Sequence, residues 1–185
     1  LRLLAHSRAD LLALVAAPQG GLPDTLLDWS PDPDSFCIRR ILRHIGNAEE
    51  WYVSRLVPPE TLPAEWEHDE ELPLYDFLEM ERRTAIARLE QLTDEERVRV
   101  SRPALWTNHP DEEWTARKAL RRFLEHEREH TGQVRQVLAS RRQHLLAHLA
   151  AARAELLQQV ICLDEGTLTQ TPISGRFRIT SIALP

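Results

Sequence analysis

Apolar residues recur at three- and four-residue spacing along most of the chain, which is the pattern of amphipathic helices. This spacing predicts helices over residues 3–15, 34–56 and 73–92, and a fourth that starts at 111 or 115. Asp34 or Ser35 is the predicted cap of the second helix. Strand-like alternation is nearly absent. We therefore expect an all-α fold in which four antiparallel helices pack as a bundle.

The residues after Arg142 read like a second start of the same pattern. ARAELL at 152–157 is similar to SRADLL at 7–12, and GRFRITSIAL at 175–184 is similar to DSFCIRRILR at 34–43. This weak internal repeat predicts a bundle over 1–142, followed over 143–185 by the first helix and the start of the second helix of a similar unit. Because the chain also lacks an initial Met, we expect it to be part of a longer tandem protein.

The junction near Arg142 leaves two alternatives. No Gly or Pro interrupts residues 133–165, so the fourth helix either continues or stops at an uncapped joint near 140–144. A truncated second unit leaves the apolar stripe of residues 145–160 without partner helices. We expect this stripe to pair with another chain, which makes a homo-oligomer.

Three histidines occupy the apolar faces of two predicted helices. His126 and His130 are one turn apart on the stripe that contains Phe123 and Val134, and His44 lies on the apolar face of the second helix. An apolar stripe excludes polar groups that have no partner. Three neutral imidazoles that converge from two helices bind divalent zinc, nickel or iron well. The pattern predicts a metal site, although ordinary hydrogen-bond partners could also account for it.

Residues 126–130 also read H-E-x-x-H, the zinc metalloprotease pattern in which the Glu acts as general base. Zinc proteases usually draw the third ligand from downstream, and Glu155 or Glu165 could supply it here. The downstream residues lack the H-x-x-G-x-x-H continuation, and no sheet is predicted that could pair with a substrate strand. A zinc hydrolase is therefore the less favoured interpretation.

Charge and cysteine content exclude several classes of protein. The formal net charge is -6, from 29 acidic residues against 23 Lys plus Arg, and no basic block stands alone. We expect neither nucleic acid nor a membrane as a partner, because both anionic surfaces require a basic patch and a span requires a long apolar run. Cys37 and Cys162 are too few for a disulfide framework, which suits the reducing cytoplasm.

The residues that carry a family resemblance are IRRILRHIGNAEEWY in the second helix and LWTNHPDEEWTARKALRRFLEHEREHTGQVRQVL before and along the fourth. Over about residues 1–140 the chain resembles the DinB-like superfamily, also called DinB/YfiT-like metalloenzymes. The resemblance implies an up-down-down-up four-helix bundle that binds a divalent metal through one His on the second helix and an H-x-x-x-H pair on the last. In this sequence the matching positions are His44, His126 and His130.

The resemblance also implies a small set of possible activities. Some members of the family are transferases that use a low-molecular-weight thiol such as bacillithiol or mycothiol, one branch contains a mycothiol-dependent isomerase, and others have no assigned activity. It implies a metal-dependent transferase or hydrolase that acts on a small-molecule substrate. The alternative is a non-catalytic helical module for oligomerisation. The sequence selects neither the metal nor the substrate.

Other polar and aromatic residues receive simpler interpretations. Four tryptophans are expected to anchor loops to the bundle: Trp51, Trp66, Trp106 and Trp114. Of these, Trp106 is the best candidate to line a substrate pocket. His109, His144 and His148 are predicted to lie at the surface. Three acids are possible hydrogen-bond partners of the metal ligands: Glu49, Glu127 and Glu129.

Overall fold

The computed structural model describes residues 1–16, 20–57, 72–102, 108–161 and 163. The chain divides into two compact units, Leu1–Ser140 and Arg141–Pro185. Residues 175–184, on which the predicted internal repeat depends, lie outside the described residues. The repeat and its boundary at residue 142 therefore stay predictions.

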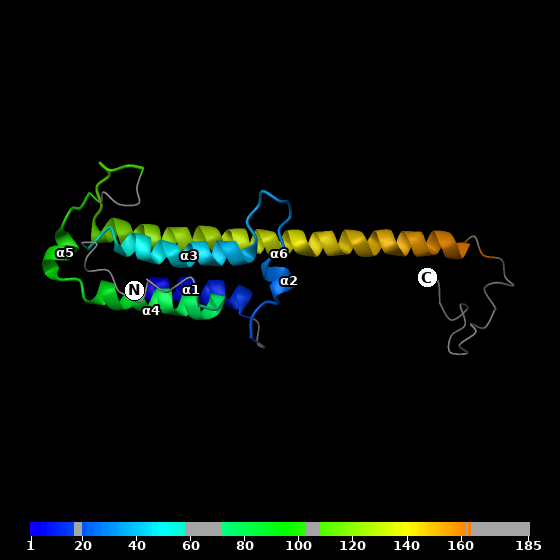
Figure 1. The fold of residues 1–185 in the computed structure, drawn as a ribbon, viewed down its shortest axis with the longest axis horizontal. Helices are drawn as coiled ribbons and strands as arrows, with labels where there is room; N and C mark the ends of the chain where they lie inside the picture. The colour runs from blue at the N-terminus through cyan, green and yellow to red at the C-terminus, as the bar shows by residue number, and fades with distance from the viewer. Residues whose placement is uncertain (17–19, 58–71, 103–107, 162, 164–185) are drawn as a thin grey trace. The chain divides into compact units, whose positions relative to one another are not determined.

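The first unit is a four-helix bundle with two added short helices (Figure 1). The elements in chain order are α1 (Arg2–Val15), α2 (Asp24–Leu27), α3 (Ile38–Val53), α4 (Leu74–Glu90), α5 (Asp94–Val98) and α6 (Ala116–Ile161). The four long helices make up the bundle, with α6 contributing its first part. Among the described residues there is no strand beyond an isolated bridge between Ser101 and Trp114. The all-α prediction is confirmed.

Contacts between helices set their directions. Tyr75 at the start of α4 hydrogen-bonds to Val15 at the end of α1, so these two helices are antiparallel. On α3 and α4, Arg43 stacks on Phe77, and farther along both helices Arg82 binds Glu49, so α3 and α4 run parallel. The ring contacts between α3 and α6 follow opposite orders along the two helices, so α6 is antiparallel to α3. The topology is therefore up-down-down-up, as the resemblance implies, and not four helices that all alternate in direction.

The helix ends differ from the sequence prediction in two places. α3 begins after Cys37 with no side-chain cap, so Asp34 and Ser35 do not cap it. Instead, the Asp32 carboxylate accepts hydrogen bonds from the backbone N–H groups of Asp34 and Ser35 and closes a local turn. α3 also ends at Val53, three residues earlier than predicted, and the buried Leu56 follows it in a turn.

The short helices α2 and α5 were not predicted, because four or five residues are too few to show a helical period. α5 nevertheless carries a start signal in its sequence. Thr93 and Glu96 form a capping box, in which each side chain accepts a hydrogen bond from the other residue's backbone N–H. The predicted loop after Thr93 therefore begins with a capped turn.

α6 is a single continuous helix across the junction near Arg142. It runs without interruption over 46 residues, from Ala116 to Ile161. No helix in the described ranges is long and apolar enough to cross a membrane.

α3 and α4 approach each other closely at Gly46. The Phe77 ring lies against the glycine, and a Cβ atom added there would overlap the ring. Gly46 and Phe77 are both buried. Glycine at this position therefore allows the two parallel helices to pack with an aromatic ring between them.

Tyr75 connects the turn after α1 to α4. Its hydroxyl donates to the Val15 carbonyl at 2.7 Å and accepts from the Leu22 N–H at 3.0 Å. Gly21 lies against the same ring with a φ of 102°, where a Cβ atom would come within 2.7 Å of the Tyr75 Cζ. Both the backbone conformation and the available space therefore favour glycine at position 21.

Candidate metal centre

The three predicted ligands meet between α3 and α6. The Nε2 atom of His126 lies 3.1 Å from Nε2 of His44 and 3.0 Å from Nε2 of His130. One ring nitrogen from each histidine can be chosen such that all lie within 4.8 Å of one another. The structure thus brings together all three residues, and this group could hold a metal ion.

Helix geometry explains how the pair on α6 forms. His126 and His130 are four residues apart, so their rings project from adjacent turns of one face, with centroids 4.3 Å apart. Both histidines are half-buried, whereas His44 lies at the surface. α3 runs antiparallel to α6 and supplies His44 from the opposite side. The site therefore has one wall made by each helix and opens toward solvent at His44.

Gln133 fixes the orientation of one ligand. Its Oε1 lies 2.8 Å from Nδ1 of His130, and a carbonyl oxygen can only accept, so Nδ1 carries the proton. The Nε2 lone pair of His130 is then free to face the other two rings. This arrangement is the usual one for a metal-bound imidazole, whose second nitrogen donates to a nearby oxygen. Gln133 was not predicted as part of the site, although its place three residues after His130 on one helix was a usable signal.

The surroundings of His126 and His44 favour neutral imidazole. Burial lowers the pKa of His126 to about 3, and the charges of His130, His44 and Arg122 contribute in the same direction. Partial burial also lowers the pKa of His44, with His130 as the second cause. Neutral imidazole is the form that coordinates a metal.

The predicted acidic partners of the ligands have a different role. Glu49 and Glu127 lie beneath the histidines in a buried cluster with Arg8 and Arg82. Glu127 Oε1 accepts from Arg8 Nε at 2.7 Å and from Arg82 Nη2 at 2.8 Å, while Glu49 Oε1 binds both arginines as well. We call these four residues the ion quartet. It joins all four long helices, because each helix supplies one member.

The two acids of the ion quartet are buried, Arg82 is half-buried, and the formal charges of the four residues balance. Arg8 also donates to the Leu78 carbonyl at 3.0 Å, and Arg82 donates to the Leu4 carbonyl at 3.2 Å. Burial raises the pKa of Glu49, and the two arginines act in the opposite direction. Charged groups can be kept inside a protein when they are paired and hydrogen-bonded in this way.

This geometry corrects two interpretations. Glu127 is the Glu of the H-E-x-x-H pattern, yet its side chain is buried and its Oε1 is bound by Arg8 and Arg82. It is therefore not placed as the general base of a zinc protease. Glu49 is bound in the same cluster and Glu129 is exposed, so the oxygen that orients a ligand comes from Gln133 instead.

Aromatic residues pack beside the histidines. The Tyr52 ring lies 5.7 Å from the His126 ring and 5.5 Å from the Phe123 ring. Trp51 contacts Trp114 edge to face at 5.3 Å, and Trp114 is buried in the core. Burial raises the pKa of Tyr52, so its hydroxyl stays protonated at neutral pH. Trp66 and Trp106, including the predicted pocket residue, lie outside the described residues.

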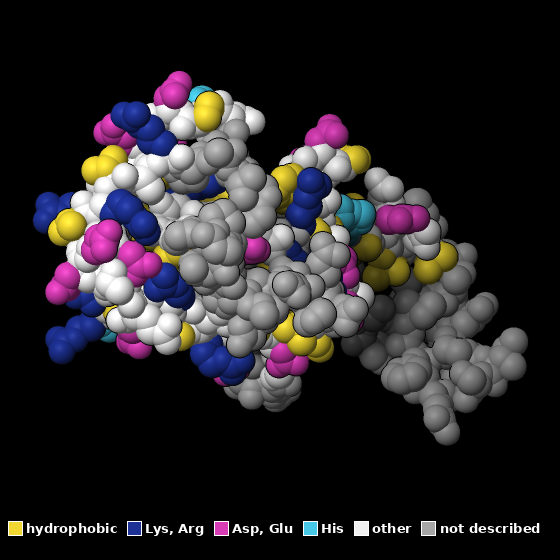
Figure 2. All heavy atoms as spheres, turned by 60° about the vertical axis from the view of Figure 1, so that its left-hand side comes forward, with side chains coloured by type: hydrophobic (Ala, Val, Ile, Leu, Met, Phe, Trp, Pro, Cys, Tyr) yellow, Lys and Arg dark blue, Asp and Glu magenta, His cyan; other side chains and the backbone are white. Residues whose placement is uncertain are grey.

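The remaining candidates lie at the surface. His109, His144 and His148 are exposed. Arg122 pairs with Glu125 at 3.2 Å, and both residues are exposed. On the described surface visible in Figure 2, Lys and Arg side chains are interspersed with Asp and Glu. No large area of a single sign appears on that part of the molecule.

Comparison with known families agrees with this architecture. A family model described as the DinB superfamily matches residues 3–134. The chain belongs to the DinB superfamily. Searches among curated proteins and among solved structures gave no match. The residues matched by the DinB model include His44, His126, His130 and Gln133, and they end before the second unit begins.

Proposed function

We propose that this DinB-superfamily protein binds one divalent metal ion through His44, His126 and His130. The observation that carries the proposal is the convergence of three Nε2 atoms from two helices, with Nδ1 of His130 held by Gln133. Three imidazoles match zinc, nickel or iron, since these borderline ions prefer nitrogen ligands. The lowered pKa values of His126 and His44 support the same assignment, because no proton has to be displaced near neutral pH.

We further propose that the site is a metal-dependent enzyme centre, and that its reaction transfers a low-molecular-weight thiol to a small electrophile. A divalent ion with three protein ligands and open positions supplies Lewis acidity and lowers the pKa of a thiol or a water. The chain itself orients His130 through Gln133 and has the Tyr52 ring, whose hydroxyl is protonated, beside His126. The site opens at the exposed His44, which suits a small substrate that approaches from solvent.

The same site could activate water for hydrolysis, but no described residue is placed as the general base that the H-E-x-x-H pattern requires. Glu127 is enclosed in the ion quartet, and this favours transfer over protease-type hydrolysis. A thiol co-substrate fits a reducing compartment, and Cys37 is a free thiol. We therefore propose the cytoplasm as the location of the protein.

Metal analysis of the purified chain tests the site. We expect one equivalent of metal per wild-type chain, and its loss in His44→Ala and in His126→Ala. His148→Ala is the matched control, because it removes an exposed histidine of α6 from a second close pair. Equal metal content in all four proteins would overturn the site.

A transfer assay tests the reaction. The metal-loaded protein is incubated with bacillithiol or mycothiol and an alkylating electrophile, and the thioether product is measured by mass spectrometry. We expect product formation that His44→Ala abolishes. If the protein binds metal but forms no product above the uncatalysed rate with either thiol, the transferase proposal is wrong while the metal site stands.

A further inference from the structure

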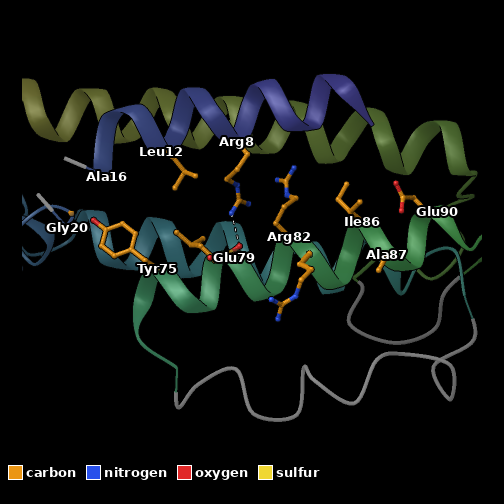
Figure 3. Close-up of a pocket in the computed structure, with 13 residues that line it drawn as sticks. Arg8, Leu12, Ala16, Gly20, Tyr75, Glu79, Arg82, Ile86, Ala87 and Glu90 are labelled. Carbon is orange, nitrogen blue, oxygen red and sulfur yellow. Dashed lines mark hydrogen bonds between the residues drawn. The ribbon is translucent and has the colours of Figure 1, made fainter. Parts of the chain in front are cut away.

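A groove lies between α1 and α4 (Figure 3), and none of the three histidines lines it. Its volume is about 760 Å³. Leu12 from α1 and Ile86 from α4 project into it, and Leu78 forms part of its wall. Arg8 and Arg82 also reach the groove, but their charges are balanced by the acids of the ion quartet. The groove is therefore largely apolar, with room for several aliphatic side chains.

Two carboxylates lie along the α4 edge of this groove. Glu79 and Glu90 are exposed and line the groove eleven residues apart (Figure 3). Eleven residues complete three helical turns, so both side chains lie on one face, about 16 Å apart along the axis. Arg83 lies between them, which leaves two negative charges against one positive charge at this edge.

The second unit carries a row of exposed leucines on its helical part. On its helical part Leu145, Leu149 and Leu156 are 46%, 67% and 54% exposed. Their spacing of four and seven residues places them in one stripe on one face of α6. A stripe of exposed leucines on a helix is typical of a surface that binds an apolar groove.

Two arginines flank that stripe at the same spacing as the groove carboxylates. Arg142 and Arg153 are both exposed, lie on the same flank of the leucine stripe, and are eleven residues apart. The pair on α6 and the pair Glu79 and Glu90 therefore match in separation and are opposite in charge. Two contacts at equal spacing define a register, which a single ion pair does not.

We propose that the leucine stripe of one copy docks in the α1–α4 groove of a second copy. Leu145, Leu149 and Leu156 then fill the apolar groove, while Arg142 and Arg153 face Glu79 and Glu90. This is recognition of a helix by a groove, with aliphatic anchors that supply affinity and rim charges that supply register. The proposal is independent of the metal site and of any catalytic activity.

Charge-reversal variants of the full chain test the docking, with sedimentation velocity as the readout. We expect the wild-type chain to self-associate in the micromolar range. Glu79→Arg with Glu90→Arg, and separately Arg142→Glu with Arg153→Glu, should each weaken association by about tenfold or more, because like charges then face each other. Mixing the two double variants should restore a heterodimer, because one of its two groove contacts keeps the wild-type charges and the other has opposite charges in reversed order.

A matched control separates register from general charge effects. Glu95→Arg with Asp111→Arg changes the net charge as much as the groove variant, at exposed positions outside the groove. This control should leave association unchanged, and circular dichroism should show equal helicity in all variants. A wild-type chain that stays monomeric up to near-millimolar concentration would overturn the proposal. Association that none of the charge reversals weakens, or that the control weakens equally, would overturn it as well.

Discussion

His44 and His126 are 82 residues apart in the sequence, and their Nε2 atoms lie 3.1 Å apart in the folded chain. This contact depends on two helices that run in opposite directions and on the ion quartet beneath them. Glu127 directly follows His126 on α6, and Glu49 lies five residues after His44 on α3. Arg8 and Arg82 bind both acids, so the same cluster that joins the helices also fixes the depth at which the histidines meet.

Replacement of Gln133 by Ala should weaken metal binding and leave the fold intact. The variant removes the oxygen that holds Nδ1 of His130, and loss of such a partner typically reduces metal affinity by about 10- to 100-fold. Competition with a chromophoric chelator measures the affinity. Gln133→Glu is the control, because its carboxylate keeps an acceptor at the same place. Equal affinity of the Ala variant and the wild type would contradict a role for Gln133.

Replacement of Glu127 by Gln should lower stability. A neutral amide at this position cannot balance the charges of Arg8 and Arg82, and loss of one charge from a buried pair costs about 3–5 kcal/mol. Urea unfolding followed by circular dichroism gives the change in the free energy of unfolding. Glu129→Gln, on the exposed face of the same turn, should change it by less than about 0.5 kcal/mol.

The same Glu127 variant distinguishes structure from catalysis. At temperatures where it remains folded, we expect Glu127→Gln to keep its metal and to retain a measurable rate in the transfer assay. In an enzyme that used this Glu as general base, the metal-loaded variant would lose its activity while keeping its stability. Loss of activity with unchanged stability would support Glu127 as the general base of an H-E-x-x-H enzyme.

Two helical glycines should respond in opposite directions to the same change. Gly46→Ala places a methyl group inside the Phe77 ring, and overpacking of this kind typically costs about 1–3 kcal/mol. The gain in helix propensity, at most about 1 kcal/mol, does not offset the larger part of this cost. Gly132→Ala has the same gain in propensity and no atom within 4 Å of the new Cβ, so it should stabilise the protein.

Thermal unfolding of the two glycine variants checks this contrast. A lower melting temperature for Gly46→Ala and a higher one for Gly132→Ala is the expected result. Phe77→Leu in the Gly46→Ala background should recover part of the loss, because it makes room for the methyl group. Destabilisation by both alanines would show that helix packing at Gly46 is not the cause.

Removal of the metal should lower thermal stability in a concentration-dependent way. An ion that binds only the folded state stabilises it by about 2.7 kcal/mol when its free concentration is 100 times the dissociation constant. Calorimetry with zinc added to the chelator-treated protein should therefore show a rising melting temperature. His44→Ala should show a much smaller rise. An equal rise in both proteins would place the stabilising ion elsewhere.

The long helices and the histidine group could be predicted because periodicity is a local signal. Residues at three- and four-residue spacing reveal which face of a helix is buried, and this placed His44, His126 and His130 toward one interior. The topology did not follow from periodicity, because parallel and antiparallel neighbours have the same amphipathic pattern. The resemblance to the DinB-like superfamily supplied it.

The ion quartet could not be predicted, because its four members come from four helices and pair only in three dimensions. A partial signal was present: Arg8, Glu49 and Glu127 each lie on an otherwise apolar stripe, where an unpaired charge would be costly. From the sequence, both acids were only possible partners of the histidines, and nothing in the spacing selected between them. The arginines, farther away in sequence, proved to be the stronger partners.

The place of the three histidines along the chain also affects the unfolded state. An ion held by His44 and His126 links residues 82 positions apart and closes a long loop, much as a disulfide does. Cross-links that close long loops remove more chain entropy than those that close short ones. The ion would thus act as a reversible staple, and the cell could tighten or release the bundle through the supply of metal alone.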